Sequence, residues 1–172
     1  MSEKVLSYQI YIDAPRTQVW DVIADFGNVA NLSPGIKKSY LTSDITRGVG
    51  ATRHCDLALY GSTVDERIVE WTEGESFRID IYESSRLPLI KTSGGSFHVA
   101  DHDGGTLLTG TLHYSLKYGP IGSLVEKLAL RKQLAREWKI FLAGTKKHIE
   151  TGTLIDRDTR VPVDAVNAGA KA

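Results

Sequence analysis

The sequence has little sulfur, no excess of either charge and no long apolar run. It holds one cysteine, Cys55, in 172 residues, which excludes an internal disulfide and a zinc site built from several cysteines. Lysine plus arginine equals aspartate plus glutamate, at 21 each. A general nucleic-acid binder is therefore not expected, because it needs surplus cations to neutralise phosphates.

Membrane and export signals are also missing from the sequence. No apolar stretch approaches the roughly 20 residues that span a bilayer, and the first residues lack the uninterrupted apolar segment of a signal peptide. The sequence therefore predicts a cytoplasmic protein without membrane insertion.

Alternating apolar and polar residues, which are typical of β-strands, occupy much of the first two thirds of the chain. Short turns such as Thr46-Arg47-Gly48 and Glu73-Gly74-Glu75 separate these stretches and favour antiparallel neighbours. After the first strand the period changes to that of a helix, in two short pieces. The predicted strands are Val5–Ile12, Ile36–Asp44, Gly50–Ala58, Thr63–Thr72, Ser76–Ser84, Leu89–Asp101 and Gly105–Tyr118, and the predicted short helices are Pro15–Asp25 and Gly27–Leu32.

A long helix is predicted from Pro120 to about Glu150. Proline suits the first turn of a helix, and Gly152 follows the end, where a left-handed residue commonly stops a helix. At about 100° per residue the apolar side chains fall on one broad face. They are Ile121, Leu124, Val125, Leu128, Leu134, Ala135, Trp138, Phe141 and Leu142.

This order of elements predicts an α+β fold, because the strands and helices are segregated along the chain. A sheet of seven antiparallel strands should curl strongly, and it is expected to wrap around the long helix and leave a hollow. Residues 1–150 are predicted to form this single domain. Residues 151–172 are predicted to be a flexible tail, in which Val161, Val163 and Val166 could still form a short strand or dock on a partner.

Three blocks of sequence follow the order of the predicted elements. They are Tyr11-Ile12-Asp13-Ala14-Pro15 with Val19-Trp20 and Leu32-Ser33-Pro34-Gly35, then Val49-Gly50-Ala51-Thr52-Arg53, and then Asp65-Glu66-Arg67-Ile68-Val69-Glu70-Trp71. With these blocks the chain resembles the START/Bet v 1-like helix-grip superfamily, also called SRPBCC, and most of all its polyketide cyclase/dehydrase and lipid transport branch. The resemblance implies a cavity for small hydrophobic molecules between a curved sheet and the long helix, but it does not select one activity.

Glu66 is the first candidate binding residue. It alternates with Val64 and Ile68, so these three side chains share one face of their strand. The resemblance implies that this acid faces the cavity and helps to bind a polar group of the ligand through water. The alternative is a carboxylate on the sheet surface, paired with a cation of a neighbouring strand.

Arg131 is the second candidate. On a helical wheel it lies near the centre of the apolar face, beside Trp138 and away from Arg136 and Glu137. A lone buried guanidinium is very costly, so an inward Arg131 would need an acidic ligand or Glu66 beside it. The alternative is that its long stem passes the apolar rim and reaches water.

Arg53 is a further candidate, since an inward guanidinium could orient a carboxylate or phenolate ligand. Cys55 shares its strand face, and an inward thiol there is expected to be an inert small hydrophobe. The histidines show no metal-ligand spacing such as His-Glu-x-x-His, so neither a metal nor a cofactor is expected. The expected ligand-binding set, beyond Glu66, Arg131 and Arg53, is Val64, Ile68, Trp138, Leu128, Leu134, Tyr82 and His98.

Three functions stay open at this point. The leading hypothesis is a binding or carrier protein for a small hydrophobic or amphipathic ligand, with Tyr60–Thr63 and Ser85–Leu89 at the cavity mouth as a gate. The second is a cyclase/dehydratase-type enzyme, in which Glu66, His98 or a tyrosine moves protons. The third is a protein-interaction module whose cavity is filled by aromatic side chains. Self-association into a homodimer is left open.

Overall fold

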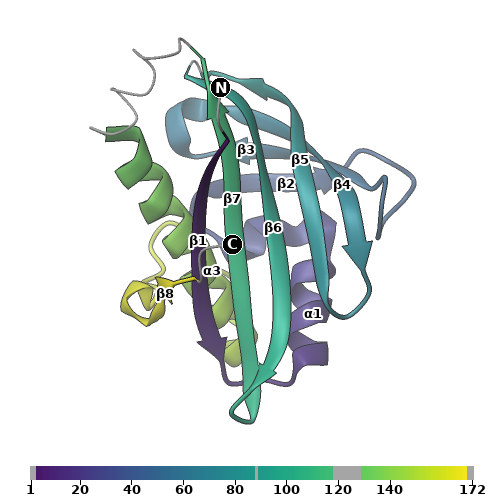
Figure 1. Cartoon of the computed structure of the whole chain (residues 1–172), viewed down its shortest axis with the longest axis vertical. Helices are drawn as coiled ribbons and strands as arrows, with labels where there is room; N and C mark the ends of the chain where they lie inside the picture. The colour runs from purple at the N-terminus through teal and green to yellow at the C-terminus, as the bar shows by residue number, and fades with distance from the viewer. Residues whose placement is uncertain (1–2, 88, 118–128, 170–172) are drawn as a thin grey trace.

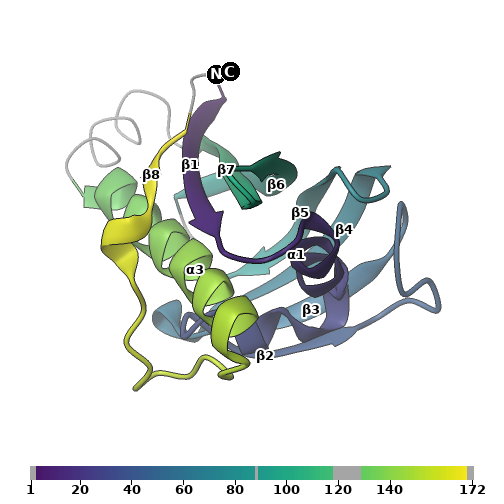
Figure 2. The same cartoon turned by 90° about the horizontal axis from the view of Figure 1, so that it is seen from below.

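The computed structural model describes residues 3–87, 89–117 and 129–169. One curved antiparallel sheet encloses a long helix, and Figures 1 and 2 show both α-helices on its concave side. In chain order the elements are β1 (Lys4–Ile12), α1 (Arg16–Ala24), the 3-10 helix η1 (Phe26–Leu32), β2 (Ile36–Leu41), β3 (Thr52–Leu57), the 3-10 turn η2 (Leu59–Gly61), β4 (Thr63–Thr72), β5 (Ser76–Ser85), β6 (Ile90–His102), β7 (Gly105–Leu116), α3 (Arg131–Thr151), the 3-10 turn η4 (Val163–Ala165) and β8 (Asn167–Ala168).

The strand order in the sheet is β2-β3-β4-β5-β6-β7-β1-β8. All neighbours are antiparallel, as the short turns predict, because parallel neighbours need long crossovers. The α+β helix-grip prediction is confirmed. The strand from Thr63 to Thr72 has the predicted bounds, and the others differ by a few residues at their ends.

The helix α1 closes one end of the grip. Its inward side carries Val19, Trp20 and Ile23, all buried, at the spacing of three and four residues that places side chains on one helical face. The following η1 buries Phe26, Val29 and Leu32. Together these short elements fill the space that the curved sheet leaves beside the long helix (Figure 2).

The helix α3 runs from Arg131 to Thr151 and ends as the sequence predicts. Gly152 has φ +72°, and its N–H donates to the carbonyl oxygen of His148 at 2.8 Å, an arrangement that satisfies an otherwise unpaired carbonyl. The predicted first part of this helix, Pro120 to Leu128, lies outside the described residues. None of the described helices is long and apolar enough to cross a membrane.

The segment after α3 corrects two predictions. The described part of the expected flexible tail folds back over α3, with Ile155 and Val166 4 and 6 % exposed. Its strand β8 pairs with β1, so the sheet has eight strands and not seven. The physical reason is that three or four well-placed apolar residues and a few backbone hydrogen bonds suffice to anchor a segment on an existing apolar surface.

Candidate functional site

A cavity of about 750 Å³ lies between the sheet and the first turns of α3. This volume falls in the range of small-molecule sites, roughly 300–1,000 Å³. Its walls are mainly apolar and come from the start of β4 and β6, the end of β5 and β7, the turn before β2, and α3. They include Ile36, Leu57, Val64, Ile81, Leu87, Ile90, Leu112, Tyr114, Leu130 and Leu134.

Trp138 and Phe141 of α3 form the floor of this cavity. Their rings stack at 5.5 Å between centroids, and both approach the ring of Phe97 on β6. Two glycines make room for the indole, because a Cβ on Gly95 would lie 3.1 Å from Trp138 Cη2 and a Cβ on Gly110 would lie 3.2 Å from its Nε1. The close approach of α3 to the sheet therefore depends on the absence of side chains at these two positions.

Beyond the floor the space between sheet and helices is filled. Trp20, Trp71, Phe77 and Phe97 continue the aromatic cluster, with successive ring centroids 4.9 to 5.9 Å apart. This separation is normal for packed aromatic pairs. The grip thus has one filled half and one hollow half. The expectation that aromatic side chains fill the cavity, which belonged to the protein-interaction module, is wrong because Trp138 and Phe141 line open space.

Glu66 lies in the cavity wall and is ion-paired to Arg53. The side chains of Arg53 and Glu66 are 7 and 10 % exposed, and the guanidinium Nε donates to Glu66 Oε2. Arg53 Nη1 also donates to the carbonyl oxygen of Phe26 at 2.9 Å, and the guanidinium lies 4.0 Å from the centre of that ring. Arg53 is therefore held behind Glu66 and does not line the cavity.

The register of the sheet explains how Glu66 is aimed. Arg53 and Glu66 are cross-strand partners on β3 and β4, and the pairing of β4 with β5 is irregular between Asp65 and Glu66. Such an irregularity re-aims a side chain beside a site. Val64, Glu66 and Ile68 share the inward face and are all buried, as their alternation predicts.

Cys55 completes the buried cluster. Its Sγ lies 3.8 Å from Glu66 Oε2, at which the thiol points. Burial raises the pKa of the Cys55 thiol to about 12, and the neighbouring Glu66 carboxylate acts in the same direction. A thiol with this pKa is a poor nucleophile at neutral pH.

Several polar residues of the cavity lining are not among the site residues predicted from the sequence. Glu137 and Gln133 of α3, Ser33 before β2 and Ser93 of β6 all line the cavity. Glu137 was expected on the polar side of the helix. The helical wheel failed here because it records apolar spacing along α3 and not which surface of the helix meets the cavity.

The two loops predicted at the cavity mouth both contribute to the lining. Leu59 and Tyr60 of η2, and Arg86, Leu87 and Leu89 between β5 and β6, belong to the lining. Tyr60 and Arg86 have φ +54° and +55°, a conformation that costs energy for residues other than glycine. The loops touch, since a Cβ on Gly61 would lie 3.3 Å from Arg86 Nη1.

The other predicted site residues lie elsewhere. Arg131 is exposed, so its long side chain takes the alternative course to solvent. Tyr82 is 49 % exposed and lies 4.9 Å from the Arg67 guanidinium, and His98 is exposed on the outer face of β6. Ile68 is buried in the core and not in the cavity wall.

Of the remaining predicted residues, Val64, Glu66, Trp138 and Leu134 line the cavity. Leu128 lies outside the described residues. Within the described ranges no three histidine, cysteine, aspartate or glutamate side chains are grouped as metal ligands.

Comparison with known families identifies the chain. Residues 4–150 match the family model described as "Polyketide cyclase / dehydrase and lipid transport". The chain belongs to this family. The predicted membership of the START/Bet v 1-like superfamily is thereby confirmed, and the match covers every described element up to the end of α3 except Thr151 itself. No curated protein matches the sequence.

Solved structures share the fold of this family member at low sequence identity. The protein TTHA0849 from Thermus thermophilus is 19% identical with a TM-score of 0.70, over 85% of this chain and 97% of that one. A START superfamily protein from Mycobacterium smegmatis is 16% identical with a TM-score of 0.66, over 87% and 99%. The ZhuI aromatase/cyclase from Streptomyces sp. R1128 is 14% identical with a TM-score of 0.66, over 90% and 100%. These similarities show the fold and not the activity.

Proposed function

We propose that this protein binds a small hydrophobic or amphipathic molecule in the cavity between the sheet and α3. The observation that carries the proposal is the hollow of about 750 Å³ with mainly apolar walls and a buried carboxylate, Glu66, in one of them. Apolar ligand surface buried there contributes about 25 cal/mol per Å². The few polar groups fix the orientation of the ligand.

The mouth loops support a role in ligand entry. Tyr60 and Arg86 hold left-handed backbone conformations in two loops that touch across the opening, and such strained residues often occur at ligand clamps. Movement of η2 away from the β5–β6 loop would open the cavity without disturbing the sheet.

Titration with a neutral fluorescent probe, 1,6-diphenylhexatriene, tests the proposal. The probe is expected to bind and fluoresce in the apolar cavity. Ser93→Trp places a large side chain on the inward face of β6 and should weaken binding by at least about tenfold, which is about 1.4 kcal/mol. His98→Trp adds the same side chain on the exposed face of the same strand and should leave binding unchanged. Equal binding of the probe by both variants would contradict the proposal.

A cyclase/dehydratase-type reaction is the second candidate. It is favoured by two carboxylates, Glu66 and Glu137, in the wall of one cavity, because positioned carboxyl groups can transfer protons during an aldol condensation. Incubation with heptane-2,4,6-trione, followed by chromatography, tests it. If a sample that binds the neutral probe does not accelerate cyclisation, the enzymatic function is contradicted and only ligand binding remains.

A further inference from the structure

Glu137 presents a carboxylate to the cavity without a partner in the described structure. It lies one helical turn from Gln133 and Phe141 on the cavity side of α3 and is partly buried. Its Oε2 reaches the turn before β2, 3.4 Å from where a Cβ on Gly35 would lie. Among the described residues no side chain or backbone group forms a hydrogen bond or ion pair with this carboxylate.

Glu66 presents a second acceptor to the same space. Its Oε2 receives the Arg53 Nε–H and faces the Cys55 thiol. Its Oε1 accepts no hydrogen bond from the described part of the chain, and the residue lines the cavity. An ionised carboxylate accepts hydrogen bonds and donates none, so a ligand that forms a hydrogen bond with either acid must supply the donor.

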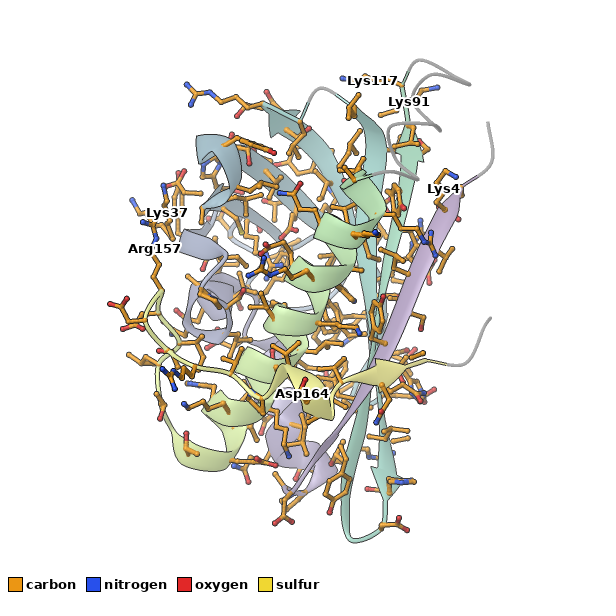
Figure 3. The ribbon with its side chains drawn as sticks, turned by 90° about the vertical axis from the view of Figure 1, so that its left-hand side faces the viewer. Lys4, Lys37, Lys91, Lys117, Arg157 and Asp164 are labelled. Carbon is orange, nitrogen blue, oxygen red and sulfur yellow. The ribbon has the colours of Figure 1, made fainter. Side chains whose placement is uncertain are left out.

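Among the described residues, the cations beside the cavity lining are exposed or held by other groups. Arg53 is held by Glu66 and by the Phe26 carbonyl, behind the wall. Arg86 lies at the mouth and is exposed. Lys91 at the start of β6 and Lys117 just after β7 are exposed, and Figure 3 shows them at the periphery of the molecule. Among the described residues, therefore, the charge of Glu66 is balanced by Arg53, whereas no cation balances the charge of Glu137.

This distribution of charge discriminates between ligand headgroups. A carboxylate ligand would bring a third negative charge beside two acids, in a space where low polarity strengthens repulsion. An ammonium group would donate hydrogen bonds to the Glu137 carboxylate and supply the missing charge. A neutral hydroxyl would donate one hydrogen bond and leave the charge of Glu137 unchanged.

We infer that the cavity selects amphipathic ligands that carry a protonated amine over those that carry a carboxylate. The inference rests on the proposed ligand binding and specifies its chemical class. Glu137 is the residue that determines this preference, and Glu66 supplies a second acceptor within the same cavity.

Three probes with the same chain test this inference: dodecylamine, dodecan-1-ol and dodecanoate, each titrated calorimetrically at neutral pH below the concentration of micelle formation. Dodecylamine is expected to bind at least about tenfold more tightly than dodecanoate, with the alcohol between them. In Glu137→Gln, which keeps the shape of the side chain, the preference for the amine should fall about tenfold while the alcohol binds as before. Glu83→Gln removes the same charge from an exposed position on β5 and should leave the preference intact.

The outcomes separate this inference from the proposed function. Binding of dodecanoate as tight as that of dodecylamine, with the alcohol bound, overturns the amine preference and leaves ligand binding standing. Failure of all three probes to bind overturns the proposed function. If Glu137→Gln and Glu83→Gln reduce the amine preference equally, the preference comes from the net charge of the protein. This result would overturn the role of Glu137. The wild-type comparison of the three probes decides the main question even if the Glu137→Gln variant does not fold.

Discussion

Two adjacent cross-strand pairs of β3 and β4 join a basic side chain to a carboxylate in opposite surroundings. Arg53 and Glu66 point inward to the cavity wall, whereas His54 and Asp65, the next pair in the register, point outward. His54 Nδ1 lies 2.8 Å from Asp65 Oδ1, and these side chains are 22 and 21 % exposed, compared with 7 and 10 % for the inner pair. Successive side chains of a strand face opposite sides of the sheet, so one residue of register separates the two environments.

The comparison shows that surroundings, and not charge type, decide what such a pair does. Inside, both charges have lost their water and depend on each other, so breaking the pair is costly. Outside, water and salt compete with the partner, and the net contribution to stability is small. The inner pair fixes the position of a carboxylate in the cavity wall, and the outer pair is expected to make stability depend on pH.

Breaking the inner pair should have the largest effect. Arg53→Met leaves the Glu66 carboxylate buried without its cation, and the free energy of unfolding is expected to fall by about 3–5 kcal/mol. Urea denaturation at neutral pH measures the change.

A double variant and an outer variant serve as controls for this prediction. Arg53→Met with Glu66→Leu removes both charges and should recover most of the loss, because apolar side chains can replace a buried ion pair at little cost. His54→Gln, in the outer pair, should cost less than about 1 kcal/mol. A loss from Arg53→Met no larger than that from His54→Gln would contradict the comparison.

The thiol beside the inner pair offers a second, smaller test. Because the pKa of Cys55 is raised to about 12 by burial, reaction of the native protein with a disulfide reagent at mildly alkaline pH should be at least about 100-fold slower than in the urea-unfolded chain. The release of coloured thiolate measures the rate. Native labelling as fast as that of the unfolded chain would show that the cluster is open to solvent.

The outer pair should produce a pH dependence of stability. The hydrogen bond with Asp65 raises the pKa of His54 above its ordinary value of 6.5. The stabilisation is therefore fully present below that value and is lost as pH rises through the raised pKa. Asp65→Asn should cost less than about 1 kcal/mol, and the loss should be greater at about pH 5.5 than at about pH 8.5. Urea denaturation at the two pH values measures it, and an equal loss at both would refute the assignment.

The smallest expected effect is that of salt, which should weaken the outer pair and leave the inner pair unchanged. Raising NaCl from about 0.05 to about 1 M shortens the screening length from over 10 Å to about 3 Å. The loss from Asp65→Asn at low pH should shrink by a few tenths of a kcal/mol, while the loss from Arg53→Met stays the same. A salt dependence shared by both variants would mean that solvent reaches the inner pair.

Local patterns in the sequence were enough for most of the architecture. Alternation along Thr63–Thr72 gave the bounds of β4 and placed Val64, Glu66 and Ile68 on one shared face. Gly152 marked the end of α3 through its left-handed conformation. These features are predictable because they depend on residues within one element.

The candidate site was only partly predictable. The sequence made Glu66 and Arg53 candidates but left open whether they face inward. It did not pair them with each other, because register is set by how strands meet. It chose Arg131 and passed over Glu137, because a helical wheel records apolar spacing and not which surface meets a cavity. The anchored tail was missed for the same reason, since the surface that covers Ile155 and Val166 comes from distant parts of the chain.

By itself, therefore, the sequence determined the order of the elements, the antiparallel sheet and which residues of a strand share a face, since these follow from local periodicity and turn chemistry. Only the tertiary structure decided that half of the grip is filled by aromatic rings and half is hollow. It also decided that Arg53 pairs with Glu66 from behind the cavity wall, while no side chain in the described ranges pairs with Glu137. Both depend on contacts between residues far apart in the chain, where packing and burial fix the cost of each charge.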